Sequence, residues 1–224
     1  FVDSEHTINR LMGEGKSVLA EGAQGTLLDI DFGSYPYVTS SNTICAGACA
    51  GLGVAPNKIG EVYGVFKAYC TRVGSGPFPT ELSNGEGERL QKQGNEFGAT
   101  TGRPRRCGWL DLPALKYAIM LNGVTRLIMT KADVLSKFEK IKICTAYKLK
   151  DGSTIEHFPY DQYDIAEPVY SEFKGWDEDV AQISTYDQMP RAFKEYAEFI
   201  EQQTGVPIHI ISTGPNRDSM IERR

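Results

Sequence analysis

The segment 97–106 concentrates more anion-binding groups than any other part of this chain. It reads Phe-Gly-Ala-Thr-Thr-Gly-Arg-Pro-Arg-Arg, so two threonine hydroxyls and three guanidinium groups, from Arg103, Arg105 and Arg106, lie within ten residues. A planar guanidinium binds carboxylate or phosphate through paired hydrogen bonds. Glycine and proline impose an unusual backbone around these arginines. A solvated basic turn is the alternative, but the spacing favours a site for an anionic small molecule on which all three guanidinium groups converge.

Two further segments carry groups suited to a nucleotide base. Thr130-Lys-Ala-Asp133 follows an apolar, strand-like run. An aspartate in such a turn can accept hydrogen bonds from the ring and exocyclic N–H groups of guanine, which favours guanine over adenine; the alternative is that Asp133 caps a helix. Ile211-Ser-Thr-Gly-Pro215 supplies hydroxyls and backbone amides at a strand end, a frequent ligand position in α/β folds, and is equally compatible with a plain turn.

Other patterns offer less chemistry. Gly13-Glu-Gly-Lys-Ser17 ends like a phosphate-binding loop, but Arg10 stands where that motif needs a glycine, so we interpret the segment as the end of a helix. The five cysteines are odd in number and lack the paired spacing of a zinc or redox site, which predicts reduced and mostly buried thiols. The three histidines stand far apart and form no local motif of the triad or metal-binding kind, so neither a triad nor a metal cluster is predicted.

Composition narrows the class of protein. The chain has 224 residues, of which 41% are hydrophobic and 24% charged, as in ordinary globular proteins. A net charge of −5 argues against a general nucleic-acid binder. No apolar run approaches the roughly 20 residues of a membrane helix. We therefore predict a folded protein with neither a nucleic-acid nor a membrane partner, and a cytoplasmic location.

Hydrophobic periodicity predicts the elements that position these segments. The run that begins at Pro190 has Phe193, Tyr196, Ala197 and Ile200 on one face and ends at Gly205, as an amphipathic helix does. Helices are expected at residues 4–13, 42–51, 112–122 and 190–205, and strands at residues 17–21, 61–69, 124–130, 140–149, 153–156 and 206–211.

Six blocks of this sequence resemble, in the same order, the motifs of the adenylosuccinate synthetase family. The resemblance covers essentially the whole chain. The blocks are Glu21-Gly-Ala-Gln-Gly-Thr-Leu-Leu-Asp29, Tyr35-Pro-Tyr-Val-Thr-Ser-Ser-Asn42, Thr71-Arg-Val-Gly-Ser-Gly-Pro-Phe-Pro-Thr-Glu81, Gly94-Asn-Glu-Phe-Gly-Ala-Thr-Thr-Gly102, Thr130-Lys-Ala-Asp133 and Ile211-Ser-Thr-Gly-Pro215.

The resemblance implies a GTP-dependent ligase of purine biosynthesis. Members of the family phosphorylate the 6-oxygen of IMP and let L-aspartate displace that phosphate to give adenylosuccinate, with Mg²⁺ bridging the phosphates. Aspartate has two carboxylates to neutralise, and developing phosphoryl charge favours fixed cations. By matching positions, Gln24, Thr39 and Arg103 would bind IMP; Ala99, Thr100, Thr101, Gly102, Arg103, Pro104 and Arg105 would bind aspartate; and Arg105, Lys131, Ala132, Asp133, Ser212, Thr213 and Gly214 would bind GTP.

The family's phosphate loop, its catalytic aspartate and histidine, and its magnesium ligands have no match in this chain, which also begins with Phe1 rather than methionine. The residues that a neighbouring subunit offers to IMP are likewise unmatched. We therefore expect a C-terminal half that has no catalytic or metal-binding residue, is inactive alone and belongs to a homodimer when full-length. Pro104 between two arginines is a smaller departure, which stiffens the loop.

The expected fold is α/β: an incomplete, mainly parallel sheet of the P-loop type, followed by an α+β C-terminal domain. Crowded glycine and proline after residue 73 predict a domain boundary near residue 70. Residues 1–69 would be the C-terminal part of the nucleotide-binding domain, and residues 70–224 would carry aspartate and guanine recognition. An exposed sheet edge would make the isolated chain dimerise or aggregate.

Two functions of other classes remain open at the level of the sequence. A non-catalytic module that binds a nucleotide or a dicarboxylate would bind its ligand tightly without any further polypeptide. A structural interaction domain would show no effect of ligands on its melting temperature.

Overall fold

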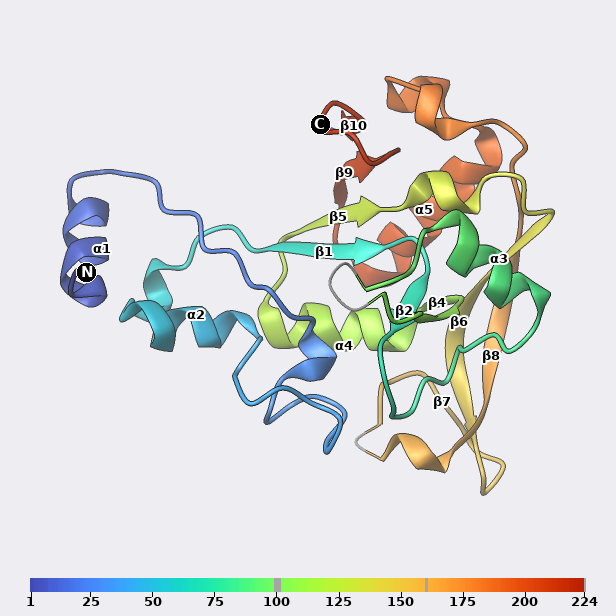
Figure 1. The fold of residues 1–224 in the computed structure, drawn as a ribbon, viewed down its shortest axis with the longest axis horizontal. Coiled ribbons are helices and arrows are strands. Elements are labelled where there is room, and N and C mark those ends of the chain that lie inside the picture. Colours follow the sequence, from blue (N-terminus) through green and yellow to red (C-terminus); the bar gives the residue numbers. More distant parts are fainter. Residues whose placement is uncertain (99–101, 160, 224) are drawn as a thin grey trace. The chain divides into compact units, whose positions relative to one another are not determined.

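The computed structural model describes residues 1–98, 102–159 and 161–223 (Figure 1). The chain divides into two compact units, one made of Phe1–Val62 and Ala118–Val124 and the other of Tyr63–Tyr117 and Thr125–Arg224. The first division falls between residues 62 and 63, and residues 118–124 return to the smaller unit, whereas the sequence predicts a single boundary between residues 69 and 70. The difference arises because the strand that begins at Tyr63 pairs within the larger unit.

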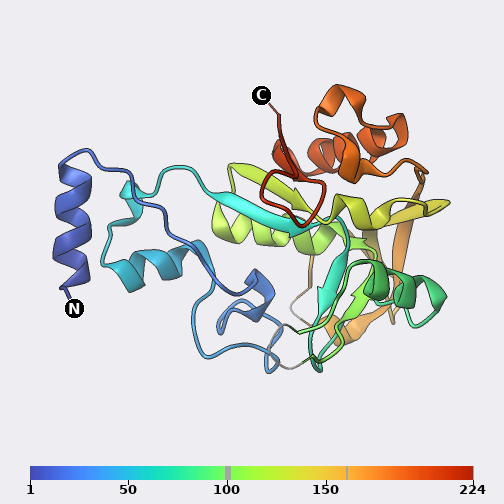
Figure 2. The same cartoon turned by 45° about the horizontal axis from the view of Figure 1, so that its top comes forward.

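The larger unit contains a four-stranded sheet with the order β1-β5-β9-β10. β1 (Tyr63–Lys67), β5 (Arg126–Thr130) and β9 (Ile208–Ser212) are parallel and run side by side in both views, and β10 (Met220–Glu222) pairs antiparallel with β9 (Figure 2). Burial alternates along β5, where Leu127 and Met129 lie in the core. This period of two is what a strand with one buried face requires.

A second sheet in the same unit is built around the long strand β6 (Lys140–Leu149). β4 (Leu110–Asp111) pairs parallel with it, and β7 (Thr154–Ile155) and β8 (Ile165–Lys174) pair antiparallel. β2 (Cys70–Arg72) and β3 (Arg106–Gly108) form a separate antiparallel pair, next to which α3 (Gly85–Gln93) packs. The mainly parallel first sheet, together with the helices, confirms the predicted α/β class.

Two helices begin and end as the sequence predicts. α5 (Arg191–Thr204) buries the four apolar residues of its predicted face and ends at Gly205, whose φ of 69° is left-handed. α4 (Leu112–Asn122) starts directly after Asp111, whose carboxylate accepts hydrogen bonds from the Ala114 amide and from the Tyr147 hydroxyl. The described loops of the larger unit contain four short 3-10 helices: η3 (Ala132–Leu135), η4 (Gln162–Asp164), η5 (Val180–Gln182) and η6 (Tyr186–Gln188).

The smaller unit contains α1 (Ser4–Gly13), α2 (Cys45–Leu52) and the 3-10 helices η1 (Thr26–Leu28) and η2 (Pro56–Lys58). The Lys16 amide donates to the Leu11 carbonyl and Gly15 has a φ of 76°, so the glycine-rich segment closes a helix, as predicted. The predicted strand at residues 17–21 is wrong. These described residues form no strand and are exposed, with Leu19 at 90%, because no neighbouring strand pairs with them or covers an apolar face.

Among the described residues, no helix combines the length and the apolar character needed to cross a bilayer.

Candidate functional site

The carboxyl ends of the three parallel strands meet at one edge of the first sheet. Lys67, the last residue of β1, is in register with Thr130, the last residue of β5, and Met129 is in register with Ile211 of β9. Open α/β sheets bind their ligands at this edge. It brings together the two predicted base-binding turns, which follow β5 and β9, and adds Lys67, which no sequence motif singled out.

The turn after β5 is an unusual piece of backbone. Lys131 has a φ of 62°, a left-handed conformation uncommon for a residue with a side chain, and its ammonium donates to the Gly94 carbonyl at 2.8 Å. Lys131, and not Asp133, occupies the N-cap position of η3, so the structure does not support the helix-capping alternative. Ala132 is fully buried, and partial burial raises the pKa of the half-buried Asp133.

The turn after β9 is folded against β10. The Ser212 hydroxyl donates to the Gly214 carbonyl at 3.1 Å, and the Thr213 amide donates to the Ser219 carbonyl at 2.9 Å. A Cβ on Gly214 would lie only 3.1 Å from the Ser219 hydroxyl, so glycine is suited to this close approach. Thr213 is 1% exposed and therefore supports the turn from within the larger unit.

The arginine loop, residues 97–106, closes on itself. The Gly98 amide donates to the Arg103 carbonyl at 2.9 Å, and the Gly102 amide donates to the Gly98 carbonyl at 2.8 Å. Gly102 has a φ of 62°, which explains why a glycine stands there. Arg103 and Pro104 are exposed at the surface of this unit. The predicted aspartate contacts Ala99, Thr100 and Thr101 lie outside the described residues.

Glu96, directly before this loop, is the most densely bonded side chain of the site and was not predicted. It is fully buried. Its Oε1 accepts from the Tyr69 hydroxyl at 2.6 Å and from the Lys67 ammonium at 2.8 Å; its Oε2 accepts from Lys67 at 2.9 Å and from Arg105 at 2.7 Å. Burial alone would raise the pKa of Glu96, but these hydrogen bonds outweigh it and lower the pKa.

The three guanidinium groups of the loop do not converge, so that expectation is wrong for Arg106. Its guanidinium pairs with the Glu81 carboxylate and donates to the carbonyls of Gly74 and Gly76, at 3.1 and 2.9 Å. Arg106 begins β3, and neighbouring residues of a strand face opposite sides. Arg105 therefore reaches Glu96 while Arg106 holds the β2–β3 segment.

In the smaller unit, Asp29 organises the loop that carries Thr39. The carboxylate is fully buried and accepts from the backbone amides of Asp31, Phe32, Thr43 and Ile44, at 3.0, 3.1, 2.6 and 3.2 Å. Burial alone would raise the pKa of Asp29, but these amides lower it. Thr39 is half-buried and its amide donates to the Leu28 carbonyl; Gln24 is exposed.

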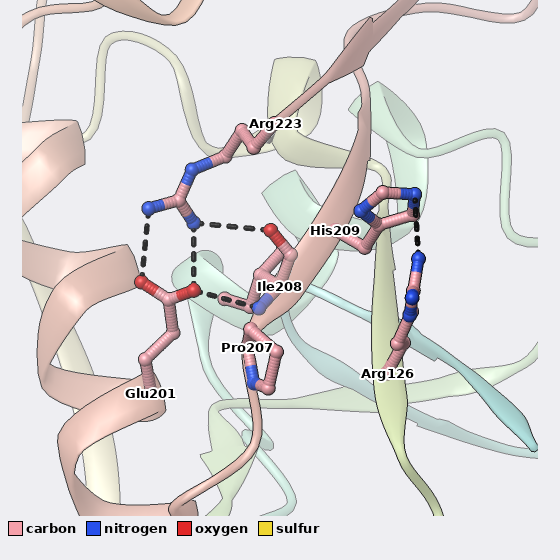
Figure 3. A pocket seen from close by; sticks show the side chains of 6 residues that line it. All are labelled: Arg126, Glu201, Pro207, Ile208, His209 and Arg223. Carbon is pink, nitrogen blue, oxygen red and sulfur yellow. Dashed lines mark hydrogen bonds and ion pairs between the residues drawn. The ribbon is translucent and has the colours of Figure 1, made fainter.

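A cavity of about 350 Å³ lies at the opposite, amino-terminal end of β5 and β9 (Figure 3). Its polar groups bind one another. Arg223 forms a two-point ion pair with Glu201, at 2.9 and 3.0 Å, and Glu201 also accepts from the Ile208 amide at 2.7 Å. His209 lies 3.5 Å from Arg126. These contacts tie the end of the described chain to α5, so we interpret the cavity as structural.

The described part of the chain gives little reason to expect a metal site or a reactive thiol. No group of three or more His, Cys, Asp or Glu side chains there could hold a metal ion. All five cysteines are free, as predicted. Cys107 and Cys144 are buried and the other three are half-buried, so burial is less complete than predicted.

Comparisons with known proteins agree with the blocks identified in the sequence. The family model for adenylosuccinate synthetase matches residues 1–221. Adenylosuccinate synthetases of Bacteroides thetaiotaomicron and Bacteroides fragilis are 61% and 63% identical over 223 residues, which cover 100% of this chain and 52% of each relative. The chain thus spans about half the length of the curated relatives it matches.

Comparison with solved structures shows that the fold is shared as well. A fully ligated adenylosuccinate synthetase from Plasmodium falciparum is 44% identical and superposes with a TM-score of 0.97 over 100% of this chain and 54% of that one. A cyanophage S-2L succinoaminodeoxyadenylate synthetase has a TM-score of 0.61 at 19% identity, over 97% of this chain and 49% of that one, and shares the fold. Together with the family match over nearly every residue, these findings show that the chain belongs to the adenylosuccinate synthetase family.

Proposed function

We propose that this chain supplies the aspartate and guanine recognition of an enzyme that joins IMP to L-aspartate with consumption of GTP, giving adenylosuccinate. One observation carries the proposal. The Lys131 ammonium donates to the Gly94 carbonyl, two residues before Glu96, so the predicted guanine turn is fastened to the base of the predicted aspartate loop. The two half-sites of the reaction are thereby held at one edge of the parallel sheet.

Guanine recognition is assigned to Asp133 with the turn at Ser212, Thr213 and Gly214. The ring N1–H and the exocyclic amine of guanine both donate, and a half-buried carboxylate accepts two such bonds well. Adenine offers an acceptor at the ring position and would face the carboxylate with a lone pair. Ala132 is fully buried, so its methyl group is not exposed to a ligand.

Aspartate and phosphoryl recognition are assigned to the arginine loop. Arg103 and the amides and hydroxyls of residues 99–102 would hold the two carboxylates of aspartate, with Pro104 keeping the loop rigid, and Arg105 would face the GTP side. Fixed cations stabilise the charge that develops when the γ-phosphoryl group moves to the 6-oxygen of IMP, and again when the aspartate amine displaces it. Gln24, Thr39 and Arg103 would contact IMP.

The residues that transfer protons are assigned to polypeptide beyond this chain, so the chain alone is expected to be inactive. Mg²⁺ would neutralise the GTP phosphates when bound. The described residues offer no group of metal ligands, so no step is assigned to magnesium here. A homodimer and a cytoplasmic location remain part of the same proposal.

The test compares this 224-residue chain with the full-length protein that contains it. The full-length protein should convert IMP, GTP and L-aspartate to adenylosuccinate, and this chain alone should not. Asp133→Ala in the full-length protein should abolish the preference for GTP over ATP, with Asp187→Ala, on an exposed 3-10 helix, as the control. Turnover by the chain alone would contradict the assignment of proton transfer. Unchanged discrimination in Asp133→Ala would contradict the guanine assignment.

Ligand titrations of this chain with GTP and L-aspartate separate the alternative functions. A non-catalytic module predicts tight binding of GTP or aspartate to this chain without turnover by any longer form. An interaction domain predicts that neither ligand changes the melting temperature.

A further inference from the structure

We propose that Lys67 and Glu96 are positioning residues that act on Arg105: Glu96 fixes its guanidinium, and Lys67 cancels the charge of Glu96, so that Arg105 keeps a net positive charge for one anionic group of a substrate. This inference rests on the proposed function. The anionic group is a phosphoryl oxygen of the nucleotide or a carboxylate oxygen of aspartate, which share this chemistry.

Glu96 has the geometry of a fixed anchor. Both of its oxygens are occupied, and the donors are three residues from two parts of the chain: Lys67 and Tyr69 at the end of β1, and Arg105 from the loop. The Arg105 amide also donates to the Glu96 carbonyl at 2.9 Å, and the Arg105 carbonyl accepts from Gln91 at 2.7 Å. Main chain and side chain of Arg105 are therefore both held.

An anchor of this kind has an electrostatic cost. A carboxylate 2.7 Å from a guanidinium satisfies its charge, and an arginine neutralised in this way attracts a second anion weakly. The guanidinium has five N–H donors, however, and one bond to Glu96 leaves further donors for a ligand. Geometry is thus no obstacle to ligand binding by Arg105, but net charge is.

Lys67 removes this obstacle. Its ammonium lies 2.8 and 2.9 Å from the two oxygens of Glu96 and donates its remaining bond to the Thr71 hydroxyl at 2.8 Å. These contacts use the three donors of an ammonium group, so Lys67 acts by its charge and leaves ligand hydrogen bonds to Arg105. Lys67, Glu96 and Arg105 together carry a net charge of about +1 by simple counting.

Lys131 and Asp133, which lie next to these three residues, leave that sum unchanged, and Asp179 acts electrostatically on Asp133. Lys131 and Arg105 both act electrostatically on Lys67, and Asp133 acts on Tyr69. Counting Lys131 and Asp133 adds one charge of each sign. The side chains of Lys67 and Arg105 are 26% and 31% exposed while that of Glu96 is fully buried. The surplus positive charge is therefore on the solvent side, where a ligand arrives.

The experiment is a charge-restoring pair of substitutions in the full-length protein, assayed with IMP, GTP and L-aspartate. Lys67→Met leaves Glu96 and Arg105 as a neutral pair, and should raise the KM of one substrate about tenfold with kcat nearly unchanged. Lys67→Met with Glu96→Gln returns the net charge to +1 while the amide oxygen still accepts from Arg105. The double variant should recover most of the lost affinity, to within about threefold of the parent.

The substrate whose KM moves identifies the anion: GTP indicates a phosphoryl oxygen, and L-aspartate indicates a carboxylate. Lys140 and Glu172 form an exposed ion pair at 2.9 Å, so Lys140→Met and its double variant with Glu172→Gln are matched controls that should leave every KM unchanged. A double variant that is no better than Lys67→Met, at an unchanged melting temperature, would overturn the inference. Lys67→Met with an unaltered KM for every substrate would do so as well.

A second readout does not depend on turnover. Pyrophosphate and L-aspartate are used as probes of the melting temperature of the full-length protein. One of them should stabilise the parent, lose that effect in Lys67→Met and regain it in the double variant. If the parent is inactive but this pattern is seen, the proposed reaction is wrong and the role of Lys67 and Glu96 stands. If the parent is active and the pattern is absent from both readouts, the role of these residues is wrong and the reaction stands.

Discussion

Asp29 in the smaller unit and Glu96 in the larger unit are both fully buried carboxylates, but they are surrounded by different donors. Asp29 accepts from four backbone amides, whereas Glu96 accepts from a lysine, a tyrosine and an arginine. Neutral amides fix the path of the chain and leave the negative charge in place. Cationic side chains cancel that charge and are themselves held in position. The first arrangement shapes a loop, and the second presents positive charge.

The largest effect is expected from Asp29→Ala, which would leave four backbone amides, one buried and three partly buried, without an acceptor. Each unsatisfied group costs about 1–3 kcal/mol, and after local relaxation we expect a total of about 4 kcal/mol, confined to residues 27–44. Hydrogen exchange of these amides measures this loss of local stability. Asp31→Ala, at an exposed position, should lose far less. Equal protection in the two variants would contradict the role given to Asp29.

Asp111 is a third buried carboxylate, but among the described residues it accepts hydrogen bonds from two donors only, which do not offset the effect of burial on its pKa. Burial, opposed only by the Tyr147 hydroxyl and the Ala114 amide, raises its pKa to about 6, above the unfolded value of about 3.9. The folded state therefore holds this proton more tightly, and the associated stabilisation is complete below about pH 4 and is lost as the pH rises through about 6, by about 3 kcal/mol. Between pH 5 and pH 8, urea unfolding should show about half of this loss, about 1.4 kcal/mol, in the parent and none of it in Asp111→Asn.

Asp29 and Glu96 should behave in the opposite sense. Their lowered pKa values contribute stability that is present above about pH 4 and is lost as the pH falls further.

Arg105 and Arg106 are neighbours in the sequence but have different partners. Arg105 contacts the buried Glu96, and Arg106 contacts Glu81. Arg105→Leu in the full-length protein should lower kcat/KM about 100-fold, which corresponds to about 2.7 kcal/mol, with little loss of stability. Arg106→Leu removes the partner of Glu81 and of two carbonyls, so it should lower the melting temperature and leave KM unchanged. Steady-state kinetics and thermal unfolding of both variants test these two roles. A loss of stability in Arg105→Leu with a raised KM in Arg106→Leu would refute them.

The smallest effect is expected at the amino-terminal end of the sheet. Arg223→Gln would break the ion pair with Glu201, whose side chain is 20% exposed, at a cost of about 1.5 kcal/mol and with no change in kinetics. Arg191→Gln is a suitable control, because its ion pair with Glu195 lies on the exposed face of α5. A change in the KM of any substrate in Arg223→Gln would give this cavity a function.

The sequence predicts what depends on local pattern and misses what depends on burial. α4, β6 and α5 agree with their predicted bounds within a residue or two, and the periodicity is strong for α5, whose four predicted apolar residues are all buried. The strand at residues 17–21 was wrong because apolar residues alone do not supply a partner strand. Glu96 and Asp29 stand within the recognised blocks, yet nothing in the sequence shows that they are buried. Lys67 was recognisable only as a lysine at the end of a predicted strand.

The central claim is that the carboxyl-terminal edge of β1, β5 and β9 binds the substrates. Hydrogen exchange of the full-length protein with and without IMP, GTP and L-aspartate tests it directly. We expect new protection at residues 94–105, 131–133 and 212–214, with residues 126, 209 and 223 around the opposite cavity unchanged. Protection confined to that cavity, with no change at the carboxyl-terminal edge, would contradict the account.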